Sequence, residues 1–340
     1  MLMIQTMRHM LTAMAMMLLL AACPTALHSK DYDPLCYCDG KPIMLADPCV
    51  YKGGDTYYLT GTSTAEKGFE YYTSKDLRNW QYGGMLYEGK GEDYVGATCY
   101  WAPEVRMYKG KYYLTFSCYS PKRQGLITCL AVSDRPDGCY KDLYEPWIDM
   151  KYSAIDCDIF VDDDGKPYLY YSHNFTKDGV ATGEIYAAPL TDDLSGITEE
   201  PRLVLSASQP WERVNWAVNR CNEGPWVIKH KGKYIMTYSA NDTGYEHYGI
   251  GVAEADNPLG PWKKYDTNPM FTTDLQHSIS SPGHNSIVYT DGRALYMAYH
   301  RHADPACKKP NWDRVTCIEK LKITRDGKLR MARAQKHHGQ

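Results

Sequence analysis

The strongest constraint on the fold of this chain is an internal repeat that occurs five times, at intervals of roughly 55 to 67 residues. Each unit contains an apolar segment, a short turn with glycine and a segment rich in aromatic residues. The units open with DPCVYKGGDTYYLTGTS (Asp47), WAPEVRMYKGKYYLTFS (Trp101), DCDIFVDDDGKPYLYYS (Asp156), EGPWVIKHKGKYIMTYS (Glu223) and HNSIVYTDGRALYMAYH (His284). Two such segments around a turn predict a β-hairpin.

The rest of each unit also has strand character, in FEYYTS, LITCLAVS, GEIYAAPL, YGIGVAEA and TCIEKLKI. No segment has the periodicity of a long amphipathic helix. Four strands in each of five units predict an all-β fold, a five-bladed β-propeller in a single domain. The repeats place this domain at residues 40–330, followed by a flexible tail at 331–340.

Composition and charge exclude some partners. The chain carries a net charge of −3 and has no basic run, so nucleic acid is not an expected partner. Its 30 tyrosines against 5 phenylalanines fit strands and surfaces that contact sugars, because the ring is apolar and its hydroxyl is polar.

The N-terminus has the pattern of an export signal. Arg8 precedes the apolar run MLTAMAMMLLLAA, which is too short to span a bilayer. The run ends in LAAC and predicts a lipoprotein signal peptide at 1–22, a lipidated Cys23 and a linker at 23–39. We therefore expect a lipid-anchored protein of the periplasm or cell surface, with the anchor as its only membrane contact; the alternative is a plain secretory signal cleaved nearby.

The chain has twelve cysteines, and lipidation of Cys23 would leave eleven. An odd number of cysteines cannot all form disulfides with one another. Export permits disulfides, but the spacing does not resemble a compact disulfide framework. We expect mostly buried free thiols with one or two bridges. Cys49, Cys157 and Cys221 lie beside the acids discussed below; a nucleophilic cysteine is one interpretation, and a small buried side chain is the favoured one.

The repeat also aligns polar residues. Counting back 11 or 12 positions from the tyrosine after each turn leads to Asp47, Trp101, Asp156, Glu223 and His284. These positions start the first strand of each unit, and in a propeller the first strands line the central axis. We therefore expect three carboxylates, a tryptophan and a histidine from distant parts of the chain to converge in one pocket.

Three carboxylates in one pocket favour glycoside hydrolysis. One acid protonates the leaving oxygen, one carboxylate activates water or attacks carbon, and the third raises the pKa of the acid. A non-catalytic glycan-binding propeller lipoprotein is the alternative from another class. Asp158 points to the same face as Asp156 and is expected to line the channel below it as a substrate contact. Asp162, Asp163 and Asp164 precede Gly165 and are expected to be solvated turn residues.

Several motifs together resemble glycoside hydrolase family 43: ADPCVYKGGDTYYLTGTS, WAPEV, AIDCDIFVDDDG, NEGPWVIKHKGKY, PGHNSIV and YHRH, over about residues 40 to 305. The resemblance implies a general base at Asp47, a general acid at Glu223, and Asp156 as the residue that tunes the pKa of the acid and orients the substrate. It implies that His284 lies near the axis, with calcium bound through water in some members. Cys157 departs from the pattern, which has proline there.

The resemblance further implies an inverting reaction that needs no cofactor, with the two reacting carboxyl groups about 6.5–9.5 Å apart. The short sequence after the fifth unit favours an α-L-arabinofuranosidase acting on plant-type polysaccharides; β-xylosidase, arabinanase and exo-galactanase are the alternatives within the family. Trp101 is expected to stack on sugar and Arg301 to contact substrate. Glu104 is either a subsite contact or a structural partner. The oligomeric state does not follow from the sequence.

Overall fold

The computed structural model describes residues 33–63, 68–89, 98–144 and 146–333. The predicted signal peptide, Cys23, most of the linker and most of the tail lie outside these ranges and stay predictions. In the described ranges the regular secondary structure is almost entirely β, with two short 3-10 helices, η1 (Pro210–Arg213) and η2 (Leu275–His277). No helix in the described ranges has the length and apolar character that crossing a bilayer requires.

Five successive antiparallel meanders make up the fold, as the repeat predicts. The first two are β3 (Ala46–Gly53), β4 (Thr56–Thr62), β5 (Gly68–Ser74) and β6 (Asn79–Glu88), followed by β7 (Thr98–Tyr108), β8 (Lys111–Ser120), β9 (Gly125–Ser133) and β10 (Lys141–Tyr144). The third contains β11 (Ala154–Val161), β12 (Pro167–Lys177), β13 (Val180–Pro189) and β14 (Arg202–Leu205).

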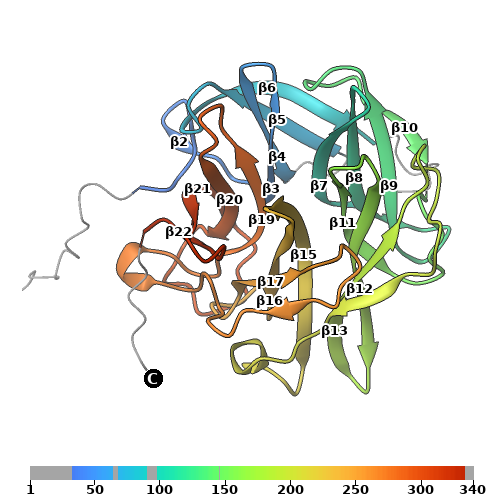
Figure 1. Cartoon of the computed structure of the whole chain (residues 1–340). Coiled ribbons are helices and arrows are strands. Elements are labelled where there is room, and N and C mark those ends of the chain that lie inside the picture. Colours follow the sequence, from blue (N-terminus) through green and yellow to red (C-terminus); the bar gives the residue numbers. More distant parts are fainter. Residues whose placement is uncertain (1–32, 64–67, 90–97, 145, 334–340) are drawn as a thin grey trace, which may run out of the picture. The chain divides into compact units, whose positions relative to one another are not determined.

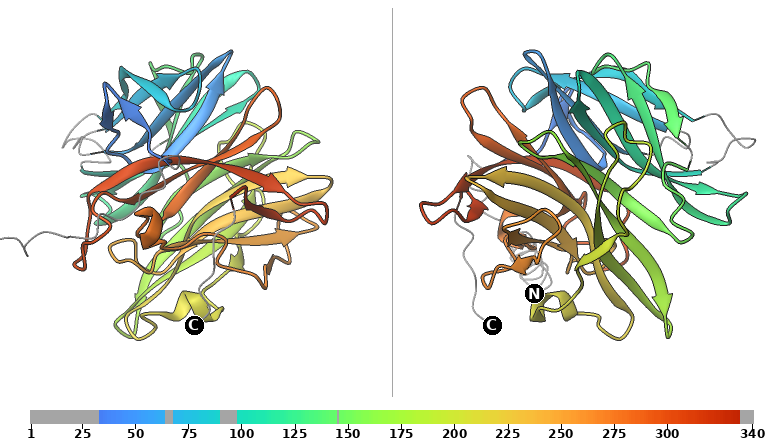
Figure 2. Two further views of the ribbon diagram at one scale, coloured as in Figure 1. Left: turned by 90° about the vertical axis from the view of Figure 1, so that its left-hand side faces the viewer. Right: turned by 45° about the vertical axis from the view of Figure 1, so that its right-hand side comes forward.

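The fourth meander contains β15 (Asn219–His230), β16 (Lys233–Ala240), β17 (Gly249–Ala255) and β18 (Lys263–Lys264), and the fifth contains β19 (Gly283–Tyr289), β20 (Leu295–His302), β21 (Arg314–Ile323) and β22 (Leu329–Met331). Figure 1 shows the meanders in chain order around a common axis, with β3, β7, β11, β15 and β19 innermost. The turned views show the twist of each sheet (Figure 2). The fold is the predicted five-bladed β-propeller.

Residues before position 40 also take part in this fold. Strand β1 (Tyr37–Cys38) pairs with β2 (Lys41–Pro42) and in parallel with β6 of the first blade. Just before it, Leu35 forms a bridge with Cys317 on β21 of the fifth blade. This segment therefore connects the first blade to the last.

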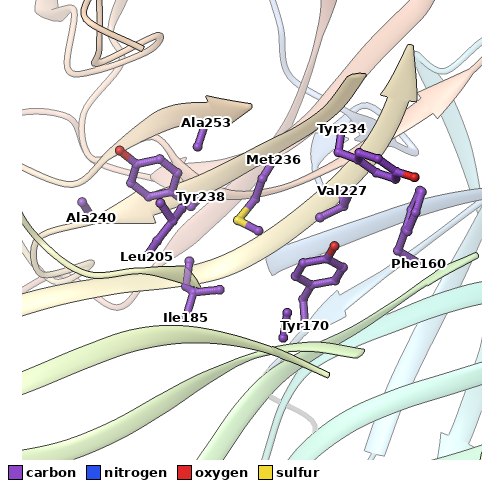
Figure 3. Packing of buried hydrophobic residues seen from close by; sticks show 11 residues of the cluster. Phe160, Tyr170, Ile185, Leu205, Val227, Tyr234, Met236, Tyr238, Ala240 and Ala253 are labelled. Atoms are coloured by element: carbon purple, nitrogen blue, oxygen red, sulfur yellow. The ribbon is translucent and has the colours of Figure 1, made fainter. Parts of the chain in front are cut away.

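The apolar core lies in layers between neighbouring blades. Figure 3 shows the layer between the third and fourth blades, where Phe160 and Tyr170 face Val227, Met236 and Tyr238. Met236 and Tyr238 are fully buried. The inner strands carry polar residues near their first positions, among them Asp47 on β3, Asp156 on β11 and His284 on β19.

Candidate active site

A β-bulge occurs at the same place in every inner strand. The pairing with the second strand shifts between Ala46 and Cys49, Trp101 and Glu104, Ile155 and Asp158, Glu223 and Trp226, and Gly283 and Ser286. Each bulge holds one residue with φ between 45° and 57°: Asp47, Ala102, Asp156, Gly224 or His284. Four of these are not glycine, and this backbone conformation is costly for them. Bulges re-aim side chains, and strain of this kind concentrates at functional sites.

The bulges correct the predicted alignment by one position. Asp47, Asp156 and His284 are equivalent, but Trp101 and Glu223 each precede the equivalent position, which Ala102 and Gly224 occupy. Counting back from the tyrosines in the sequence places all five residues at equivalent positions, which the structure shows for three of them. Because the bulge turns the chain, two successive residues of a strand can reach the same pocket, and Glu223 joins the site from the earlier of them.

Asp47 has the most closely defined environment. Its Oδ1 lies 3.3 Å from Nδ1 of His284, and its Oδ2 accepts a 2.6 Å hydrogen bond from the Thr62 hydroxyl. Its backbone N–H donates to Nδ1 of His300 at 3.0 Å. Burial would raise the pKa of this carboxyl, but His284 and His300 outweigh it and hold the pKa below its usual range. Asp47 is therefore ionised at neutral pH.

His284 lies among the three predicted acids. Burial would lower its pKa, but Asp47, Asp156 and Glu223 together raise it, in that order of effect. Gly224 packs directly against this ring: a Cβ at Gly224 would lie 3.2 Å from Cγ of His284. The surrounding carboxyl groups thus favour the positively charged imidazolium, and the structure brings together the four titratable residues that were predicted to converge, Asp47, Asp156, Glu223 and His284.

Asp156 binds the strand that carries Glu223. Its Oδ2 accepts a 3.2 Å hydrogen bond from the backbone N–H of Gly224, the residue after Glu223. Burial raises the pKa of Asp156 to about 7; His284 opposes this, while Glu223 and Asp47 add to it. A buried carboxyl beside other carboxyls resists ionisation, so Asp156 is protonated in part of the molecules near neutral pH. The ionised form of Asp156, in which its charge would raise the pKa of a neighbouring acid, is therefore only part of the population near neutral pH.

Glu223 lines a cavity and has two partners. Its Oε1 accepts a 2.7 Å hydrogen bond from the Tyr248 hydroxyl, and its Oε2 lies 3.2 Å from the Cys221 thiol. The cavity has a volume of about 330 Å³ and extends between the third and fourth blades. The ring of Tyr248 stacks on His300, with centroids 5.8 Å apart and planes at 6°. Through these rings the surroundings of Glu223 and Asp47 are physically connected.

Two of the predicted substrate contacts lie deeper in the channel. Asp158 is fully buried and forms a bidentate ion pair with Arg106, at 2.7 and 2.8 Å. Arg106 in turn stacks on Trp226, 3.5 Å from the ring centroid. Glu104 is also buried, and burial, followed by the charge of Asp158, raises its pKa well above the usual value. Asp158 is thus a structural residue, contrary to the prediction, and Glu104 fits the structural alternative.

Arg301 does not face the acids. Residues alternate along β20, so His300, which contacts Asp47, and Arg301 point to opposite faces. Arg301 is buried, and its Nη1 donates to the carbonyl oxygen of His302 at 2.8 Å. The YHRH segment reaches the site through His300 instead. Trp101 is 39 % exposed and adjoins the site, because Thr62 bonds both Asp47 and the N–H of Ala102.

Sequence reasoning missed Thr62, Tyr248, His300 and Arg314. Arg314, at the start of β21, helps to lower the pKa of Asp47 and that of His300, and its charge opposes the increase in the pKa of His284. The motif YHRH points to this part of β20, but the prediction names Arg301 rather than its neighbour His300. Thr62, Tyr248 and Arg314 stand on second and third strands or loops, where the repeat gives no common register to compare.

The cysteines do not form an alternative catalytic centre. Burial raises the pKa of the thiols of Cys49, Cys157 and Cys221, which disfavours the thiolate that a nucleophile needs. No disulfide joins two of the described cysteines, and the sulfur atoms of Cys118 and Cys129 approach to 3.5 Å without a bond. The expected one or two bridges are therefore not present among them.

The residues around His284 do not make a direct metal site. Within the described ranges, no three His, Cys, Asp or Glu side chains are arranged to hold an ion. His284 Nε2 is buried without a hydrogen-bond partner among these residues, and this nitrogen is free for a water. A raised pKa favours the imidazolium, which has no lone pair for a metal. Calcium bound through water stays a prediction, and no step of the reaction depends on it.

The aspartates at the turn after β11 are not all solvated. Asp162 forms a 2.5 Å ion pair with Lys229 and accepts a 2.6 Å hydrogen bond from the Tyr234 hydroxyl, both from the fourth blade. Asp163 lies 3.0 Å from the same lysine, and Asp164 pairs with Lys166. These three aspartates lie at the far end of β11 from Asp156, as expected for residues outside the catalytic pocket. Asp162 has a structural role instead, because it connects the third and fourth blades.

The chain is similar in sequence to curated glycosidases. The chain is 27 % identical to a beta-D-galactofuranosidase of Aspergillus niger over 85 % of this chain and 84 % of that protein. It is 30 % identical to xylosidase/arabinosidase 43A of Humicola insolens, over 67 % and 73 %. It covers 47 % of the length of some other curated relatives, among them a beta-xylosidase of Bacillus subtilis.

A solved thermostable family-43 glycoside hydrolase superimposes with a TM-score of 0.80 at 38 % identity, over 85 % of this chain and 93 % of that one. The sequence model for "Glycosyl hydrolases family 43" matches residues 41–329. The match spans all five blades and every residue of the site described above. The chain therefore belongs to glycosyl hydrolase family 43 and is a glycoside hydrolase.

Proposed function

We propose that this enzyme removes terminal α-L-arabinofuranosyl groups from plant-type polysaccharides or oligosaccharides, with inversion at the anomeric carbon. The observation that carries the mechanism is the unequal setting of the acids. Asp47 is held ionised beside His284, whereas Glu223 lines a cavity and stands next to a carboxyl, Asp156, whose pKa is raised to about 7. Environments that separate two carboxyls in this way are those of a base and an acid.

In the proposed reaction Asp47 takes a proton from a water molecule as that water attacks the anomeric carbon. The glycosidic carbon–oxygen bond breaks, and Glu223 donates a proton to the departing oxygen. Asp156 orients the strand segment that carries Glu223, because it accepts a hydrogen bond from the N–H of Gly224. The His284 imidazolium offsets the charge of Asp47 while the water is being deprotonated.

The names of the relatives support a furanoside substrate and leave the sugar open to test. They include a beta-D-galactofuranosidase, xylosidases and exo-alpha-(1->5)-L-arabinofuranosidases. An α-L-arabinofuranoside and a β-D-galactofuranoside have the same configuration around the five-membered ring and differ only in the exocyclic group. A site for one is therefore chemically close to a site for the other, whereas a β-xyloside presents a six-membered ring.

The test is a panel of p-nitrophenyl glycosides with the purified protein, with the anomer formed first followed by proton NMR. The proposal expects highest kcat/KM on the α-L-arabinofuranoside and inverted product. Asp47→Asn and Asp156→Asn should lose about 10²–10⁴-fold in kcat. Glu223→Gln should lose as much on a substrate with an alcohol or sugar leaving group, which needs a proton, and much less on the p-nitrophenyl glycoside, whose phenolate departs without one. Retention of configuration, or near-normal turnover in Asp47→Asn, would contradict the mechanism. A preference for the xyloside would contradict the proposed substrate and make the protein a xylosidase.

A further inference from the structure

Two cavities flank the third blade at the end of the propeller that carries the acids. The first, of about 330 Å³, is lined by Glu223, Phe175 and Asp242 among others. The second, of about 400 Å³, lies between the second and third blades and is lined by Tyr152 and Ala154, two residues before Asp156. Since β11 begins and β12 ends at this end of the sheet, both cavities open beside the catalytic strands.

A strip of three aromatic rings connects these cavities: Tyr152, His173 and Phe175. The ring centroids of Tyr152 and His173 are 4.2 Å apart, and those of His173 and Phe175 are 4.7 Å apart, with interplanar angles of 40° and 34°. His173 and Phe175 share a face of β12 because side chains alternate along the strand. Tyr152 belongs to the lining of one cavity and Phe175 to that of the other.

The strip has one exposed ring, Tyr152, and two half-buried rings, His173 and Phe175, and it is fixed in place. Tyr152 is 41 % exposed, and its hydroxyl lies 2.6 Å from that of the buried Tyr171, which holds the ring in position. Burial lowers the pKa of His173, so its imidazole is neutral at neutral pH and presents a flat, uncharged ring. Exposed aromatic rings that are held rigid make efficient contacts with the apolar faces of sugars, with little loss of conformational entropy.

We propose that Tyr152, His173 and Phe175 form a platform that binds the part of a glycan substrate beyond the scissile bond. This inference rests on the proposed role of Glu223, because the general acid marks the side on which the leaving group departs. A chain that continues from the first cavity passes over the strip to the second. There the ion pair of Arg123 with Asp149, at 3.1 Å, offers polar groups to sugar hydroxyls. The enzyme is thus built for an oligomeric or polymeric leaving group.

The test compares a substrate that reaches the platform with one that does not, in the full chain. For Tyr152→Ala and Phe175→Ala, kcat/KM on arabinan or arabinoxylan should fall about tenfold each, mainly through KM, because one aromatic contact is lost. On p-nitrophenyl α-L-arabinofuranoside the change should stay within about twofold. Tyr152→Phe keeps the ring but loses the hydrogen bond to Tyr171, so its kcat/KM on polymer should fall less than that of Tyr152→Ala and its activity on the aryl glycoside should equal that of wild type. Tyr82→Ala removes a 55 % exposed tyrosine on β6 of the first blade and is the matched control.

Binding without turnover separates this inference from the proposed function. In native gels that contain arabinan or arabinoxylan, wild type should be retarded and Tyr152→Ala should migrate as in a gel without glycan. If wild type cleaves no arabinofuranoside but is still retarded through Tyr152, the substrate proposal fails and the platform stands. If both alanine variants keep wild-type KM on polymer and wild-type retardation, the platform is refuted. It is also refuted if they lose polymer and aryl glycoside activity equally, while thermal melting shows that they are folded.

Discussion

Replacing Asp158 by asparagine should destabilise the protein while leaving its chemistry largely intact. Asp158 is fully buried, and its carboxylate receives two hydrogen bonds from Arg106 and one of 3.4 Å from the N–H of Val227. The change keeps the size of the side chain but removes its charge. Arg106 then remains under Trp226 without its bidentate partner.

The size of the effect follows from what remains around Arg106. Breaking a buried ion pair from one side costs about 3–5 kcal/mol of unfolding free energy. Two features reduce the cost: the side chain of Arg106 keeps 22 % exposure, and Glu104 acts electrostatically on the same guanidinium. We therefore expect about 2–3 kcal/mol for Asp158→Asn, and the full 3–5 kcal/mol for the double variant Glu104→Gln/Asp158→Asn.

Urea unfolding followed by fluorescence gives both free energies, and kcat/KM on an aryl glycoside is measured well below the unfolding transition. The expected kcat/KM of Asp158→Asn is within about threefold of wild type, since the residue is held away from the substrate by Arg106. Loss of several orders of magnitude in kcat with unchanged stability would refute this reasoning and return Asp158 to the catalytic pocket. Equal stability of the single and double variants would remove Glu104 from its compensating role.

Three further predictions concern charge and thiols. The raised pKa of Asp156 means that the folded protein holds this proton more tightly than the unfolded chain, so the stability of wild type falls as pH rises from about 4 to about 7. The melting temperature of Asp156→Asn should therefore gain on that of wild type across this pH range. A difference in melting temperature that is constant at all pH values would contradict this prediction. Asp162→Ala should lose about 1 kcal/mol of stability with unchanged turnover, because it breaks a contact between blades, whereas Asp164→Ala at the exposed tip should lose almost nothing; urea titration distinguishes them. Titration with a thiol reagent should label the exposed Cys139 rapidly in the native protein and the buried thiols only after unfolding, and fewer thiols after unfolding without reductant would reveal a disulfide.

The sequence determined the architecture because the repeat is encoded locally. Alternating apolar residues around a glycine turn specify a hairpin wherever they occur, and five copies with no helix between them leave few arrangements other than a propeller. Equivalent strand starts then had to meet at the axis. This is why Asp47, Asp156, Glu223 and His284 were found together before any contact was known.

Only the tertiary structure decided how each side chain is used. The bulges place Glu223 one position out of register, a shift that depends on backbone angles rather than residue type. Because side chains alternate along β20, His300 rather than Arg301 contacts Asp47. Because β7 packs against β11, Arg106 forms an ion pair with Asp158. Thr62, Tyr248 and Arg314 come from elements outside the aligned register. Their roles arise from proximity between distant segments, which a local pattern does not encode.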